Sequence, residues 1–117
     1  MKIKNFLLIL FFLIFKSQLS LADEAKMAKG LEIFNETAGC AACHVLKAAG
    51  SEGNIGPNLD TVAGLTLESV KDIVTHGLGV MPAFEEAGIL TKEEIDIVSF
   101  YVANSVGKWT IFQVILK

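Results

Sequence analysis

The sequence predicts a small all-α domain, because two segments combine apolar residues at helical spacing with clear helix-capping residues. Residues 66–76 carry one apolar face, a threonine that can cap the start (Thr66) and a glycine that can end the helix (Gly77). The second segment opens with Thr91-Lys92-Glu93-Glu94, which fits a capping box, and should end near residues 104–107. No two strand-like runs flank a helix, which argues against a βαβ fold.

An earlier helix is expected over residues 23–37. Met27, Gly30, Leu31 and Phe34 fall at i, i+3, i+4 and i+7 and form one apolar face. A glycine in the middle of a helix costs about 1 kcal/mol relative to alanine. We therefore expect a second helix to cross closely at Gly30.

Residues 1–22 are typical of a secretory signal peptide. Lys2 and Lys4 precede ten consecutive apolar residues, and Ser20-Leu21-Ala22 offers a small-x-small cleavage site. The alternative is a retained membrane anchor, but ten residues fall short of the ~20 that a spanning helix needs. We expect cleavage after Ala22 and a periplasmic protein of a Gram-negative bacterium.

The chain after residue 22 is acidic. It holds seven lysines, no arginine and thirteen acidic residues, for a formal charge of −6. This balance argues against nucleic acid and anionic membrane as partners and suggests a partner with a basic docking surface. A domain of this size has a marginal core and would gain from a cofactor at its centre.

The strongest chemical signal is Cys40-Ala41-Ala42-Cys43-His44, which has the C-x-x-C-H pattern of c-type haem attachment. Two cysteines one helical turn apart can bond the two vinyl groups on one haem edge as thioethers. The histidine that follows can give iron an imidazole nitrogen. The sequence therefore predicts one covalent haem c, with Cys40 and Cys43 as attachment points and His44 as the iron ligand.

The two cysteines have three alternative uses. A disulfide is favoured for a bare C-x-x-C in an oxidising compartment, whereas a thioredoxin-like site needs βαβ units. A zinc site needs four ligands, and its candidates would be Cys40, Cys43, His44 and His76. The adjacency of His44 to Cys43 suits haem better than tetrahedral closure around zinc.

Met81 is the expected second axial ligand. It lies on a loop shaped by Gly77, Gly79 and Pro82, between two predicted helices. Thioether ligation raises the reduction potential of haem iron. His76 is the rival ligand, although a histidine at a helix C-terminus is also explained by the helix dipole.

Taken in order, these motifs resemble those of class I c-type cytochromes, over about residues 23–107. The resemblance rests on the Gly30–Phe34 spacing, the haem motif, Gly56-Pro57-Asn58-Leu59, Met81-Pro82-Ala83-Phe84, and Tyr101-Val102. It implies an all-α cytochrome c fold around one haem, with Gly30 and Tyr101 near a helix crossing. It also implies that the Pro57 carbonyl accepts the His44 N–H, and that Pro57 and Tyr101 contribute to the haem site.

The resemblance implies an electron carrier that exchanges electrons with a donor and an acceptor protein and is not an enzyme. A haem subunit of a periplasmic dehydrogenase complex is the alternative, and a gas-binding haem protein would need an open sixth position. Residues 108–117 form an apolar tail that such cytochromes need not have. We expect it to pack on the domain, or to dock a partner or the membrane surface.

Overall fold

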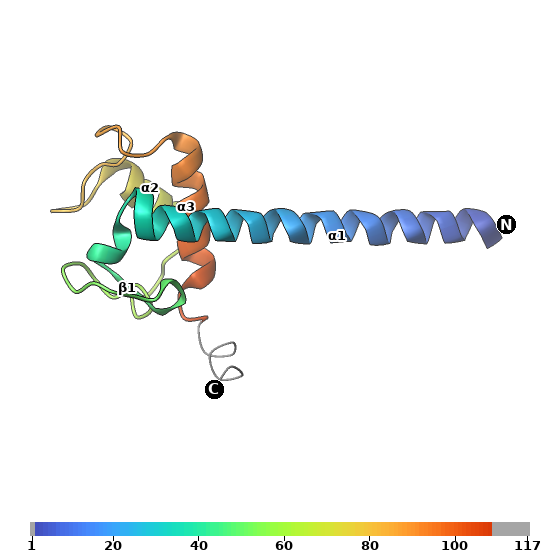
Figure 1. Cartoon of the computed structure of the whole chain (residues 1–117), viewed down its shortest axis with the longest axis horizontal. Helices are drawn as coiled ribbons and strands as arrows, with labels where there is room; N and C mark the ends of the chain where they lie inside the picture. The colour runs from blue at the N-terminus through green and yellow to red at the C-terminus, as the bar shows by residue number, and fades with distance from the viewer. Residues whose placement is uncertain (1, 109–117) are drawn as a thin grey trace.

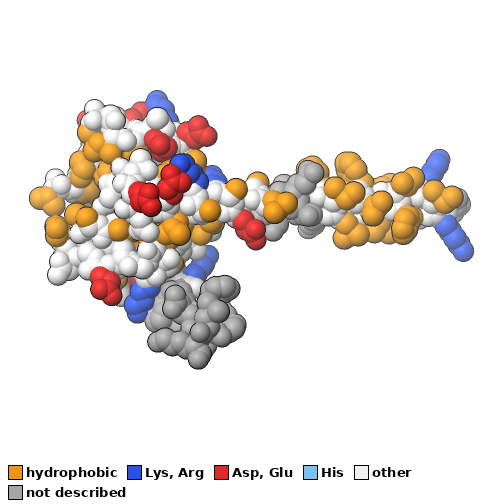
Figure 2. Space-filling model, viewed as in Figure 1, with side chains coloured by type: hydrophobic (Ala, Val, Ile, Leu, Met, Phe, Trp, Pro, Cys, Tyr) orange, Lys and Arg blue, Asp and Glu red, His pale blue; other side chains and the backbone are white. Residues whose placement is uncertain are grey.

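A computed structural model describes residues 2–108 of the chain, with only the backbone described for residues 16–20. Helix α1 (Lys2–Glu32) begins far from the domain and ends inside it (Figure 1). The large apolar residues between positions 6 and 15 are exposed along its projecting part (Figure 2). The expected signal sequence and first helix thus share one continuous helix. Most of the predicted tail lies outside the described residues.

A π-helical turn, η1 (Ile33–Thr37), continues α1 into the core. Its wider turn is closed by a hydrogen bond from Ala38 N–H to Ile33 O at 2.9 Å. Ile33 and Phe34 are almost completely buried. Such turns are rare and concentrate near functional sites, because they shift side chains relative to a regular helix. Here the turn carries Phe34 into the centre of the domain.

Helices α1 and α3 (Lys92–Ser105) cross at Gly30, as the sequence predicts. A Cβ placed on Gly30 would lie 2.3 Å from the Tyr101 Cβ and 3.1 Å from the Ile97 carbonyl oxygen. The Tyr101 ring also packs against Phe34, with ring centroids 6.0 Å apart. Only glycine lets the two backbones approach this closely.

The capping residues act as expected at both later helices. Thr66 caps α2 (Leu67–His76) by accepting the Ser69 N–H, and Thr91 caps α3 by accepting the Glu94 N–H. In each case the third residue of the helix bonds back to the threonine backbone, which completes the capping box. Gly77, with φ +75°, ends α2.

A short antiparallel ladder lies outside the predicted helices. Strands β1 (Val45–Leu46) and β2 (Ser51–Glu52) pair with Leu46 opposite Ser51. They flank a 3₁₀ turn, η3 (Lys47–Ala49), and follow another, η2 (Cys40–Ala42). The fold is otherwise all-α, as predicted, and this hairpin is part of the loop that follows the haem motif.

One core joins these elements. Its buried apolar side chains come from η1, β1, α2, α3 and the loop before α3: Ile33, Phe34, Leu46, Val70, Val74, Phe84, Leu90, Ile95, Val98, Tyr101 and Val102. Within residues 2–108, leaving aside the side chains of 16–20, none of the helices is both long and apolar enough to cross a membrane.

Candidate haem-binding site

The Cys40–His44 motif forms a tight turn at the end of η1. Gly39 enters it with φ +67°, and the amides of Cys43 and His44 both donate to the Cys40 carbonyl, at 3.1 and 3.0 Å. The positive φ explains the glycine, since other residues rarely adopt it. The turn places two half-buried cysteines and the histidine within one short stretch of chain.

The two cysteines do not form a disulfide with one another. Burial raises the pKa of the Cys40 thiol to about 11, so this group is neutral at ordinary pH. Among the described residues, no three His, Cys, Asp or Glu side chains are grouped to hold a metal ion. The zinc alternative therefore has no set of ligands here.

The His44 ring is fixed by its neighbours. Its Nδ1 lies 2.8 Å from the Pro57 carbonyl oxygen, the contact that the family resemblance implies. Because a carbonyl can only accept, Nδ1 carries the proton and Nε2 keeps a free lone pair for iron. Gly56 also packs against the ring: a Cβ there would lie 2.6 Å from the ring carbon Cε1.

Backbone contacts hold the Pro57 segment against the motif. Gly56 N–H donates to the Cys43 carbonyl at 2.7 Å, and Leu59 N–H donates to the Val45 carbonyl at 3.0 Å. The Asp60 carboxylate accepts the amides of Lys47 and Gly107, at 2.9 and 3.1 Å. Asp60 thereby joins the motif loop to the end of α3, a role that no pattern in the sequence indicated.

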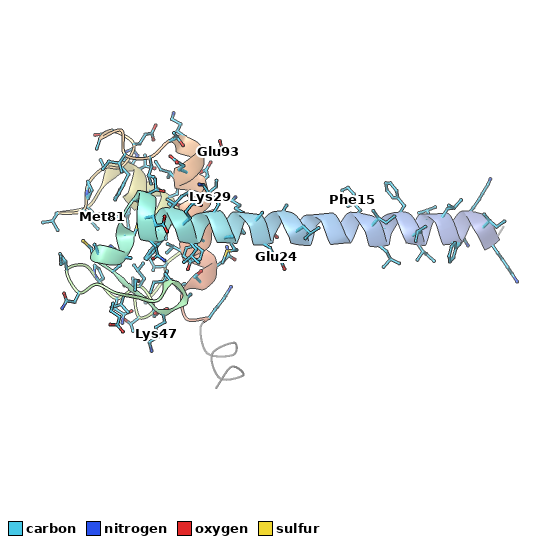
Figure 3. The ribbon with its side chains drawn as sticks, viewed as in Figure 1. Phe15, Glu24, Lys29, Lys47, Met81 and Glu93 are labelled. Atoms are coloured by element: carbon cyan, nitrogen blue, oxygen red, sulfur yellow. The ribbon has the colours of Figure 1, made fainter. Side chains whose placement is uncertain are left out.

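Met81 closes a tight turn after α2. The amides and carbonyls of Leu78 and Met81 bond to each other, at 3.0 and 3.2 Å, and Gly79 at the corner has φ +60°. A Cβ on Gly77 would lie 2.7 Å from the Met81 carbonyl, so this glycine too is required by a close approach. Met81 lies on the side of the domain away from the free end of α1 (Figure 3).

A cavity of about 650 Å³ joins the two loops. Cys40, Cys43, His44, Pro57 and Met81 all line it. Its remaining walls are largely apolar and include side chains from η1, α2, α3 and the loops: Phe34, Leu59, Val70, Val74, Phe84 and Val98. The donor set suits haem, with two thiols, one imidazole and one thioether in an apolar pocket.

Two candidate residues lie elsewhere. Tyr101 does not line the cavity; it packs at the Gly30 crossing, and burial raises its pKa. His76 lies in a separate polar groove, 3.8 Å from Asp72 and 4.0 Å from Glu86. In the structure Tyr101 thus packs at the helix crossing and not on the cavity wall, and His76 lies away from the cavity.

Comparison with known proteins agrees with this site. Residues 25–102 match the family described as cytochrome c oxidase, cbb3-type, subunit III. Cytochrome c6 of Leptolyngbya boryana is 37% identical over 87 residues, which is 72% of this chain and 98% of that protein. Cytochrome c6 of Gloeothece citriformis is 35% identical over 97 residues, or 79% and 83% of the two chains.

A solved structure shows the same architecture. The c-type cytochrome SorU from Sinorhizobium meliloti superposes with a TM-score of 0.66 at 47% identity, over 73% of this chain and 95% of that one. Sequence, fold and cavity lead to the same conclusion. The chain belongs to the class I c-type cytochromes, small monohaem proteins that transfer electrons through a covalently attached haem c.

Proposed function

We propose that this cytochrome is a periplasmic one-electron carrier in which His44 and Met81 are the two axial ligands of the haem iron. The observation that carries the proposal is the donor set of the cavity. Apart from the two attachment cysteines, His44 and Met81 are the side chains with iron-binding atoms among the described residues that line it. When bound, the haem supplies one-electron oxidation and reduction of its iron.

The residues of this chain would prepare the iron site for that exchange. Pro57 holds the His44 ring in one tautomer, and the Leu78–Met81 turn fixes the thioether at the cavity wall. The apolar walls exclude water, which together with thioether ligation favours the ferrous state. With both axial positions filled, no substrate would reach the iron.

Electrons would enter and leave the haem site where apolar residues that line the cavity reach the surface of the domain. Ile55, Leu78 and Val80 line the cavity yet are 70%, 68% and 91% exposed. Residues 53–59 and 77–84 contain no Asp, Glu, Lys or Arg. Hydrophobic side chains gather on this end of the domain, opposite the projecting helix (Figure 2). We call Ile55, Leu78 and Val80 the apolar rim.

The apolar rim changes the expectation of a basic partner. Acidic residues lie instead around the polar groove between α2 and α3, where Lys71 pairs with Asp96 and Lys92 pairs with Glu85. The net charge of the whole chain therefore does not predict the charge of the surface around the cavity opening. The partner surface that fits the rim is apolar and uncharged.

Export is part of the proposal. The side chains described before Lys26 are exposed, whereas Met27 packs against the core and Gly30 is buried. Removal of residues 1–22 would therefore leave the α1–α3 crossing intact. Mass spectrometry of the mature protein should give an N-terminus at Asp23; a full-length mass would support the retained anchor instead.

The ligand assignment is tested by Met81→Ala. The variant should keep its covalent haem, lose the weak far-red charge-transfer band of Met–iron ligation, bind carbon monoxide when ferrous and show a lower potential. His76→Ala is the control and should change none of these. If Met81→Ala leaves band and potential unchanged, Met81 is not the ligand; if the wild type binds carbon monoxide readily, the gas-binding alternative gains support.

The apolar rim also fits the second candidate, a haem subunit held in a dehydrogenase complex, because exposed apolar patches often mark stable interfaces. Purification from native periplasm separates the two functions. A carrier should elute as a single small protein, whereas a subunit should elute with a catalytic partner.

A further inference from the structure

Ser51 lies seven residues after His44, on strand β2, and is only 7% exposed. Its hydroxyl oxygen accepts the Leu46 N–H at 2.9 Å and lies 2.9 Å from the His44 carbonyl oxygen and 3.3 Å from that of Leu46. A hydroxyl has one proton to donate, and the shorter contact assigns it to His44. Ser51 therefore bonds the backbone of His44 itself.

The hairpin that presents Ser51 needs such a bond. Strands β1 and β2 have two residues each, and a ladder this short is not stable by itself. Leu46, opposite Ser51, is completely buried and anchors the hairpin in the core. The Ser51 hydroxyl thus connects the backbone of His44 to a hairpin that the buried Leu46 side chain anchors in the core.

His44 is consequently held at three places. Its amide donates to the Cys40 carbonyl, its ring donates to the Pro57 carbonyl, and its own carbonyl accepts from Ser51. Without the third contact, the His44 carbonyl loses its own partner, and the backbone after His44 is held only through its neighbours, by the β1–β2 ladder and the Leu59 N–H bond to the Val45 carbonyl. Rotation there would move the ring relative to Pro57.

We propose that Ser51 is a positioning residue for the haem ligand: it fixes the His44 backbone so that the ring stays bonded to Pro57 with Nε2 directed to iron. This inference rests on His44 being the ligand, as proposed above. A bonded Nδ1–H makes the imidazole a stronger donor and stabilises ferric iron. Loosening it should raise the reduction potential and change the orientation of the ring.

The test compares Ser51→Ala with Ser99→Ala. Ser99 is completely buried on α3, and its hydroxyl has no hydrogen-bond partner among the described residues, so the same chemical change removes no contact there. Proton NMR of the ferric holoprotein reports ring orientation through the haem methyl resonances, and voltammetry gives the potential. Ser51→Ala should shift both, with the potential rising; Ser99→Ala should shift neither.

A second pair keeps the test decisive if Ser51→Ala yields little protein. Threonine and valine have nearly the same shape and both suit a strand, but only threonine keeps the hydroxyl. Ser51→Thr should retain the wild-type resonances and potential, whereas Ser51→Val should shift them. A loss of thermal stability with unchanged resonances and potential in the variants lacking the hydroxyl would overturn the inference.

The outcomes also separate this inference from the ligand assignment. If the wild-type protein itself lacks the spectrum of a histidine-ligated haem, the proposed function fails. If the wild type shows that spectrum and every Ser51 variant matches it, only the role of Ser51 fails.

Discussion

Gly30 lies so close to Tyr101 that one added carbon atom at Gly30 would come within 2.3 Å of the Tyr101 Cβ. This contact determines how closely α1 and α3 approach, and α3 supplies Ile95, Val98, Tyr101 and Val102 to the core. It predicts that Gly30→Ala destabilises the domain. Overpacking costs about 1–3 kcal/mol and should exceed the helix-propensity gain of about 1 kcal/mol.

Chemical denaturation of the haem-loaded protein measures this change. The control is Ala28→Ser, which adds one atom at an exposed position of the same helix and should change the free energy of unfolding by less than about 0.5 kcal/mol. Equal stability of Gly30→Ala and wild type would show that α1 and α3 can separate without cost.

Gly56→Ala should disturb the ligand more than the fold. The new Cβ would lie 2.6 Å from Cε1 of His44 and 2.9 Å from its Nδ1, so the ring must move away from Pro57. We expect a shifted potential and altered absorption of the reduced protein. Gly88→Ala controls for general destabilisation, because its Cβ meets no atom within 4 Å while its φ of +66° is strained for alanine. A spectrum unchanged by Gly56→Ala would mean that the ring position is not limited by this glycine.

The capping box of α3 predicts a pH dependence. Hydrogen bonds from the Thr91 backbone and hydroxyl lower the pKa of Glu94 below its ordinary 4.5. A lowered pKa in the folded state means that this contribution to stability is present at neutral pH and is lost as the pH falls through that pKa.

Melting temperatures of Glu94→Gln and wild type should therefore differ most near neutral pH and converge in acid. Glu93→Gln removes the same charge from the neighbouring position of the same helix turn and is the matched control. A difference between Glu94→Gln and wild type that is constant across pH would assign the effect to side-chain shape and not to charge.

The apolar rim predicts electron exchange that depends little on charge. At a gold electrode coated with methyl-terminated alkanethiol, the wild-type protein should exchange electrons with a rate that changes little with salt. Val80→Glu should slow exchange several-fold, whereas Glu93→Lys on α3 should not. Faster exchange at an ammonium-terminated coating would instead favour docking through the acidic side chains.

Much of the helical framework could be predicted from the sequence, because helical periodicity and capping boxes are local along the chain. Gly30 also indicated a close helix crossing, because glycine destabilises the middle of a helix and is expected there where a larger side chain would not fit. The two-residue strands could not be predicted, because no periodicity exists in so short a segment. The hairpin was therefore missed, and Ser51 with it.

The candidate site was only partly predictable for a related reason. Motifs identified Cys40, Cys43, His44 and Met81, and the structure brings all four to one cavity. The family resemblance placed Tyr101 near the Gly30 crossing and also among the haem-site residues, and the structure shows the crossing. Whether a buried side chain also reaches a cavity depends on the angle at which the helices cross, and the order of residues along the chain does not give that angle.

The course of α1 bears on the order of maturation. The helix leaves the domain on the side away from Met81, a residue that lines the cavity, so the apolar residues near its start stand clear of Met81 (Figures 1 and 3). At 1.5 Å per residue, its first twenty residues reach about 30 Å. A chain that still carries this segment therefore leaves Cys40 and Cys43 unobstructed by it, so under the proposed export thioether formation would not have to wait for removal of residues 1–22.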